Sequence, residues 1–155
     1  MNIGIVVYSK TGNTYSVALS LRDKLIKLGH CANIERIAPV DGKQADIKKI
    51  RFDTLPALDA YEALVFCSPV QGFSLSGVMS AYLTQITSVG GKKTVCFVTK
   101  GLRSAWTGGN RSIASMKRAL ASSGAIVCAT GIVSWSSKRR DDDIAEMVER
   151  LSAAF

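Results

Sequence analysis

Short runs of β-branched and aliphatic residues alternate with amphipathic segments along this chain, and this alternation restricts its fold more than any other feature. The first run, 3–8 (IGIVVY), shows no polar alternation, which is typical of a strand buried on both faces. Residues 14–28 follow it with apolar side chains at helical spacing. By the same reasoning the sequence predicts strands at 3–8, 31–37, 63–67, 94–99 and 124–133, and helices at 14–28, 46–50, 75–86, 110–122 and from 141 onward.

Strands that alternate with helices predict βαβ units and a parallel sheet. A chain of 155 residues is of single-domain size, so one domain over 1–155 is expected. Five strands and about five helices predict an α/β doubly wound fold with strand order 2-1-3-4-5 and helices on both faces. Ligands of such sheets bind beyond the carboxyl ends of the strands, between the first and third strands.

Composition narrows the class of protein further. The formal net charge is +8, so the chain should attract anions, but its basic residues are dispersed and form no aromatic-interleaved stripe of the nucleic-acid-binding kind. No apolar run approaches the roughly 20 residues of a membrane span, and no signal peptide is visible, so a cytoplasmic location is expected. No CxxC pair or cysteine–histidine spacing suggests a metal, and buried thiols are expected at Cys31, Cys67, Cys96 and Cys128.

The loop between the first strand and the first helix is rich in hydroxyl groups. Free N–H groups and the helix dipole at such a junction favour an anion, so the loop reads as a phosphate cradle built from neutral donors. An ordinary capped helix start is the alternative, although one cap does not need three hydroxyls and a glycine. The predicted phosphate-binding residues are Ser9, Lys10, Thr11, Gly12, Asn13 and Thr14.

Two other nucleotide-binding motifs fit poorly. The segment GIVVYSKT, 4–11, is one residue away from a P-loop, but its intervening residues are strand formers and cannot wrap a triphosphate. The chain contains no G-x-G-x-x-G motif of the classical dinucleotide-binding kind either.

The pattern Ser9-x-Thr11-Gly12-x-Thr14 resembles the fingerprint [ST]-x-T-G-x-T with which flavodoxins bind the phosphate of FMN. The resemblance extends over nearly the whole chain. It implies a flavodoxin-like five-stranded fold, non-covalently bound FMN and redox chemistry.

The resemblance also implies that two later loops flank the flavin ring. Gly72 permits a peptide flip towards the flavin N5 at little steric cost. Phe73 packs either on the ring or in the core, and Trp106 either stacks on the ring or packs on the protein's own surface. Lys100 or Arg103 would stabilise a reduced, anionic flavin, or be solvated. The residues assigned to flavin binding in these loops are Ser68, Pro69, Val70, Gln71, Gly72 and Phe73, and then Thr99, Lys100, Gly101, Trp106 and Gly109.

The sequence contains no paired-carboxylate, histidine-relay or G-x-S-x-G constellation, and no catalytic residue is predicted. An FMN-dependent electron carrier is therefore the first hypothesis. An NAD(P)H-dependent FMN or quinone reductase on the same fold is the alternative, and a binding module that has lost its flavin is the third. The positive net charge predicts an acidic redox partner protein, and a monomer is favoured.

Overall fold

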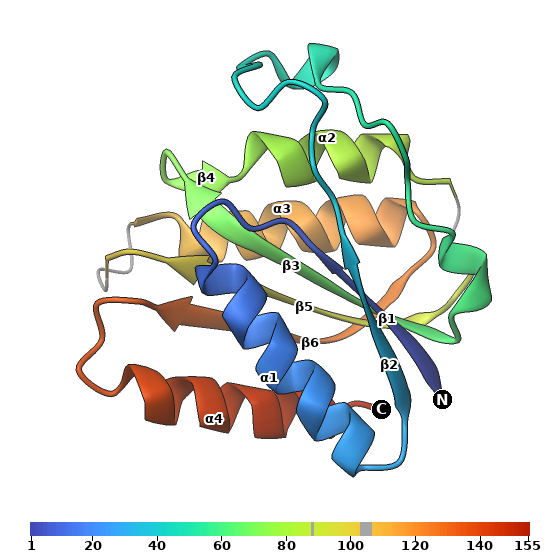
Figure 1. Ribbon diagram of the computed structural model, residues 1–155, viewed down its shortest axis with the longest axis vertical. Coiled ribbons are helices and arrows are strands. Elements are labelled where there is room, and N and C mark those ends of the chain that lie inside the picture. Colours follow the sequence, from blue (N-terminus) through green and yellow to red (C-terminus); the bar gives the residue numbers. More distant parts are fainter. Residues whose placement is uncertain (88, 103–106) are drawn as a thin grey trace.

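A parallel sheet forms the centre of the molecule (Figure 1). The computed structural model describes residues 1–87, 89–102 and 107–155. In spatial order the parallel strands are β2 (Cys31–Arg36), β1 (Asn2–Val7), β3 (Ala63–Gln71), β5 (Lys93–Lys100) and β6 (Ile126–Ser134). A two-residue strand, β4 (Ser74–Leu75), pairs antiparallel with β3. Without β4 the order is the predicted 2-1-3-4-5, so the flavodoxin-like doubly wound fold is confirmed.

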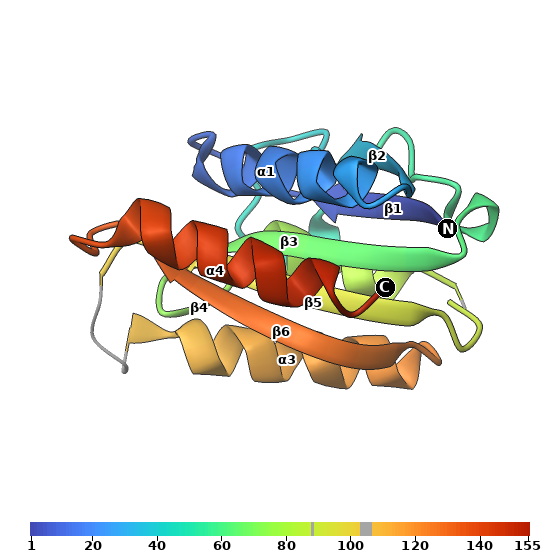
Figure 2. The same cartoon turned by 90° about the horizontal axis from the view of Figure 1, so that it is seen from below.

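Helices cover both faces of the sheet. Helices α1 (Asn13–Lys27) and α4 (Arg140–Ser152) share one face, and α2 (Gly77–Gln85) and α3 (Gly109–Ser122) share the other. Figure 2 shows α1 and α3 on opposite sides of the strands. The short helix expected at 46–50 is a 3-10 turn at Ile47–Lys49, and a second such turn occupies Leu58–Ala60. None of the helices in the described parts of the chain is long and apolar enough to cross a lipid bilayer.

The buried runs of the strands separate two apolar layers. Neighbouring residues of β1 point to opposite faces, so Ile5 packs against Leu21 and other side chains of α1 and α4, whereas Val6 joins Met79 and other side chains of α2 and α3. Both Ile5 and Val6 are fully buried. Full burial of such a side chain stabilises the fold by roughly 1.5–3 kcal/mol, which explains why β1 shows no polar alternation.

Strand β3 is longer than the sequence predicted. The expected end at Ser68-Pro69 is wrong, because β3 continues to Gln71 and Pro69 pairs with Thr99 of β5. The neighbouring strand β1 ends earlier, with Val7 opposite Cys67. Pro69 therefore lies beyond the residues of β3 that pair with β1. There its missing N–H removes no hydrogen bond between these two strands.

Two of the four cysteines are not buried. Cys67 and Cys96 lie in central strands and are buried, but Cys31 and Cys128 are exposed. The prediction for Cys31 and Cys128 was wrong because β2 and β6 are the edge strands of the sheet. Helix α2 also begins later than predicted, since Ser74 and Leu75 form β4 and the Ser76 side chain caps the helix.

Candidate functional site

The loop after β1 and the carboxyl ends of β3 and β5 meet at one edge of the sheet, where they surround a cavity of about 270 Å³. Cavities that enclose a whole drug-sized ligand run from about 300 to 1,000 Å³, so this one suits part of a nucleotide-sized molecule. All nine lining residues belong to the set predicted from sequence. They are Lys10, Thr11, Asn13, Pro69, Val70, Gln71, Thr99, Lys100 and Gly101.

The amino end of α1 offers backbone donors beside this cavity. Gly12 is the N-cap residue and has a φ of 96°, a left-handed conformation that a glycine adopts without strain. Within the described chain, no residue accepts a hydrogen bond from the backbone N–H groups of Thr11, Asn13 or Thr14. These donors, together with the positive end of the helix dipole, favour an anion at this position.

The side chain of Ser9 shapes the loop. Its Oγ accepts hydrogen bonds from the N–H groups of Gly12 and Tyr15, each over 3.2 Å. A hydroxyl that accepts two bonds still has one proton to donate. Ser9 therefore holds the turn in place and keeps one donor for a ligand.

Thr14 contacts β5 instead of lining the cavity. Its side chain is 1% exposed, and its Oγ1 lies 2.7 Å from the Oγ1 of Thr99. The backbone N–H of Thr14 lies next to the predicted phosphate position, while its hydroxyl joins α1 to β5.

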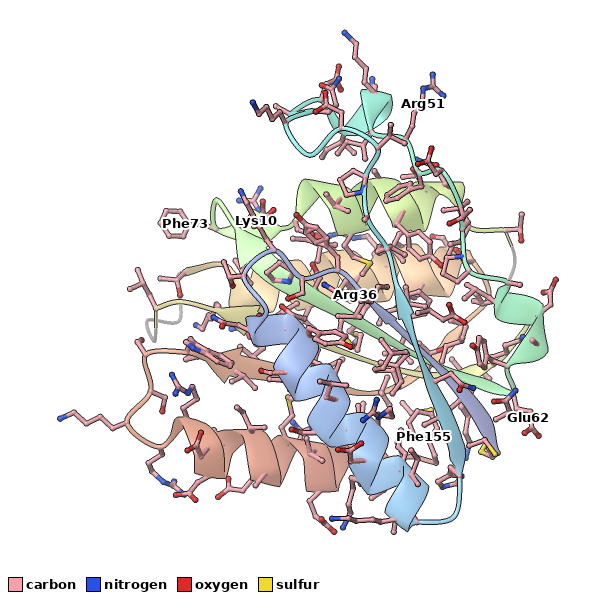
Figure 3. All side chains as sticks on the ribbon, in the orientation of Figure 1. Lys10, Arg36, Arg51, Glu62, Phe73 and Phe155 are labelled. Atoms are coloured by element: carbon pink, nitrogen blue, oxygen red, sulfur yellow. The ribbon has the colours of Figure 1, made fainter. Side chains whose placement is uncertain are left out.

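The β3–β4 connection is a two-residue hairpin turn. Gly72 and Phe73 have φ values of 57° and 60°, the pattern of the type I′ turns that suit tight hairpins. The Phe73 side chain is 51% exposed and projects away from the sheet (Figure 3). The alternative that Phe73 belongs to the core is therefore wrong. Ser68 is buried behind this loop, where its Oγ lies 2.8 Å from that of Ser76.

Lys100, the last residue of β5, is a buried cation at the edge of the cavity. It is 8% exposed, and its Nζ donates a hydrogen bond of 3.2 Å to the Oγ1 of Thr107. Thr107 in turn donates to the carbonyl oxygen of Leu102 over 3.2 Å. Sequence reasoning placed Lys100 in the site but did not predict this burial.

Gly109 does not line the cavity. Gly109 is buried at the start of α3, where an added Cβ would lie 3.1 Å from the Ile132 side chain. The lack of a side chain therefore allows α3 to pack closely against β6 beside the site. Trp106 lies outside the described residues. Among the described residues, no group of three or more His, Cys, Asp or Glu side chains could hold a metal ion.

Three larger hollows in the described parts of the chain, of about 600, about 530 and about 400 Å³, lie along α4 or at its amino end. The first is a groove between α1 and α4 that contains Trp135, with the Arg140 guanidinium carbon 4.6 Å from the centre of its ring. The half-buried Trp135 also packs on the core. None of these hollows is lined by residues from the ends of β1, β3 and β5 together, so the smaller cavity is the candidate site.

A doubly wound parallel sheet with its cavity between the first and third strands defines a flavodoxin-like α/β protein. Over its full length the chain is similar to flavodoxin 2 from Bacillus cereus, with a TM-score of 0.70, 17% identity and 100% of both chains covered. A flavoprotein from Lactobacillus acidophilus NCFM, solved in complex with FMN, is 15% identical with a TM-score of 0.64, over 94% of this chain and 97% of its own. The flavodoxin, WrbA-like protein from Agrobacterium tumefaciens is 14% identical with a TM-score of 0.70, over 98% and 95% of the chains.

No model of a known protein family matches the sequence, and no curated protein matches it either. At these identities, the structural comparisons show that the chain shares the fold of these proteins.

Proposed function

We propose that this protein binds FMN non-covalently and transfers electrons through it. The observation that carries the proposal is the convergence of the loop after β1 and the carboxyl ends of β3 and β5 on one cavity beside the amino end of α1. There the N–H groups of Thr11, Asn13 and Thr14 have no acceptor within the described chain. The Lactobacillus flavoprotein, which has a similar fold, was solved with FMN.

The residues present fit this cofactor. Ser9, Thr11 and the amides at the start of α1 would hold the phosphate through neutral donors. The stretch Pro69–Gln71 and Gly101 supply the opposite walls, and α1 keeps its orientation because Thr14 is tied to Thr99. Bound FMN would supply reversible uptake of one or two electrons, which protein side chains do not provide.

Binding is tested by titrating the purified protein with FMN and with riboflavin while flavin fluorescence is recorded. Riboflavin has the same ring but no phosphate, so FMN should bind at least about tenfold more tightly, since one charge-assisted hydrogen bond contributes about 1.5–3 kcal/mol. Thr11→Glu places a negative charge in the cradle and should weaken FMN binding by tenfold or more. It should leave riboflavin binding nearly unchanged.

Ser20→Glu is the matched control, because it adds the same charge on the exposed surface of α1. Its affinity for FMN should stay within about threefold of that of the unaltered protein. If the protein does not bind FMN at micromolar concentrations, or binds both flavins equally, the proposal is wrong.

A second candidate is an NAD(P)H-dependent FMN or quinone reductase. The observation that favours it is the pair of lysines, Lys10 and Lys100, in the cavity lining, because positive charge suits both an anionic dinucleotide and a reduced flavin. Anaerobic mixing of the FMN-loaded protein with NADH or NADPH separates the candidates. Rapid bleaching of the flavin supports a reductase, whereas no bleaching supports a carrier.

The net charge of +8 leads to a further proposal, that the redox partner of this protein is acidic. Opposite charges speed association, and salt screens them, so the association rate should fall as ionic strength rises. A rate that does not depend on salt would contradict an acidic partner.

A further inference from the structure

The burial of Lys100 affects which redox form of FMN the proposed site binds more tightly. The side chain is 8% exposed and lines the cavity from the end of β5. Its partner in the described hydrogen bond, Thr107, is a neutral hydroxyl. Burial in the protein strengthens the interaction of a charge with a neighbouring ligand, because less water screens it.

The described residues that line the cavity include a second lysine but no carboxylate. Lys10 lies on the opposite loop and is exposed, so its charge is screened by solvent. The other seven lining residues are neutral. The net charge of this lining is therefore positive, and Lys100 is the buried one of its two charged residues.

The oxidised and the two-electron-reduced forms of a flavin ring differ in charge. The oxidised ring is neutral, and it takes up two electrons and one proton to give a reduced ring that carries one negative charge. A hydride donor such as a reduced nicotinamide supplies both electrons and the proton together and leaves as the oxidised cation. A fixed positive charge nearby favours the anionic reduced form over the neutral oxidised form.

We propose that Lys100 makes this cavity bind the two-electron-reduced, anionic form of FMN in preference to the oxidised form. The inference rests on the proposed binding of FMN, and it specifies the electron chemistry of that site. Tighter binding of the reduced form makes bound FMN easier to reduce than free FMN, and this suits the reductase, which takes its electrons from a hydride donor.

The test compares the Kd of oxidised FMN with that of FMN reduced by dithionite, measured anaerobically for the protein and three variants. Lys100→Gln removes the charge and should lower the ratio Kd(oxidised)/Kd(reduced) by tenfold or more, because a charge interaction across about 12 Å or less at an effective dielectric constant of about 20 has at least this size. Lys100→Arg keeps the charge and should hold the ratio within about threefold. Lys10→Gln removes the exposed charge from the same cavity and should change the ratio by less than about threefold.

The unaltered protein provides a test that does not depend on the folding of any variant. It should bind reduced FMN more tightly than oxidised FMN. Equal or tighter binding of the oxidised form, or an unchanged ratio in a folded Lys100→Gln protein, would overturn the role of Lys100 while FMN binding stands. If neither form of FMN binds, the proposed function fails and the inference fails with it.

Discussion

The hydroxyl oxygens of Thr14 and Thr99 lie 2.7 Å apart and form a hydrogen bond that joins α1 to the carboxyl end of β5. Both side chains are buried, so water cannot replace the partner if either hydroxyl is removed. The bond fixes the amino end of α1 relative to the carboxyl end of β5, and so it fixes two walls of the candidate site.

Thr14→Val or Thr99→Val should each lower the free energy of unfolding by about 1–3 kcal/mol, because each leaves one buried hydroxyl without its partner. Replacing both should cost clearly less than the sum of the two single changes. Urea unfolding of the four proteins measures this coupling.

Thr84→Val is the matched control for that cycle. Thr84 lies in α2, and its hydroxyl donates to the carbonyl oxygen of Ala81 at an exposed position. Its loss should change stability by no more than about 0.5 kcal/mol. Additive effects of Thr14→Val and Thr99→Val would contradict a direct bond between the two residues.

Phe73→Asn should raise the free energy of unfolding by about 0.5–1 kcal/mol. Phe73 is the one residue other than glycine with a positive φ in the described chain, and the left-handed conformation costs such residues roughly 1–2 kcal/mol. Asparagine adopts this conformation readily in tight turns. Thermal unfolding in the absence of flavin measures the change.

Leu102→Asn is the control for Phe73→Asn, since Leu102 is 55% exposed at the same edge of the sheet and has no positive φ. It should alter stability by less than about 0.5 kcal/mol. A loss of stability in Phe73→Asn would show that contacts of the ring outweigh the strain of its backbone.

The two outermost thiols should react much faster than the two central ones. Cys31 and Cys128 are exposed, whereas burial raises the pKa of Cys96 to about 12 and that of Cys67 well above its ordinary value. Only the thiolate is alkylated, so buried thiols with a raised pKa react slowly. Mass spectrometry should find two labels after brief treatment of the folded protein with iodoacetamide, and four in urea. Cys128→Ser should remove one of the two fast labels. Equal labelling at all four sites would contradict the burial of Cys67 and Cys96.

Much of this structure could be predicted because it follows from patterns that are local in the sequence. The buried run at 3–8 and the helical spacing after it begin one βαβ unit, and the handedness of such units then leaves few possible strand orders. Parallel strands place all their carboxyl ends on one edge. For that reason the residues after three strands could be assigned to one cavity before any contact was known.

The rest depends on contacts that the sequence does not encode locally. Thr14 and Thr99 are 85 positions apart, and nothing near either residue indicates that they pair. The exposure of Cys128 follows from the place of β6 at the edge of the sheet, because its apolar neighbours look like those of a central strand. The burial of Lys100 likewise depends on Thr107 and α3 packing over the end of β5.

The stability of the protein should fall as the pH rises from about 10 to about 12, in part because of Tyr61. The Tyr61 side chain is buried and its hydroxyl donates a hydrogen bond to the Glu35 carboxylate. Burial and that bond raise the pKa of Tyr61 from 10.0 to about 12. In this pH range the unfolded chain has lost the tyrosine proton while the folded protein keeps it, so the folded state binds more protons and the free energy of unfolding decreases with pH. Tyr61→Phe should be less stable than the unaltered protein at about pH 9, and the difference should shrink by about pH 11. Urea unfolding at both pH values measures it; the buried thiols titrate in both proteins, so a constant difference would contradict this role of Tyr61.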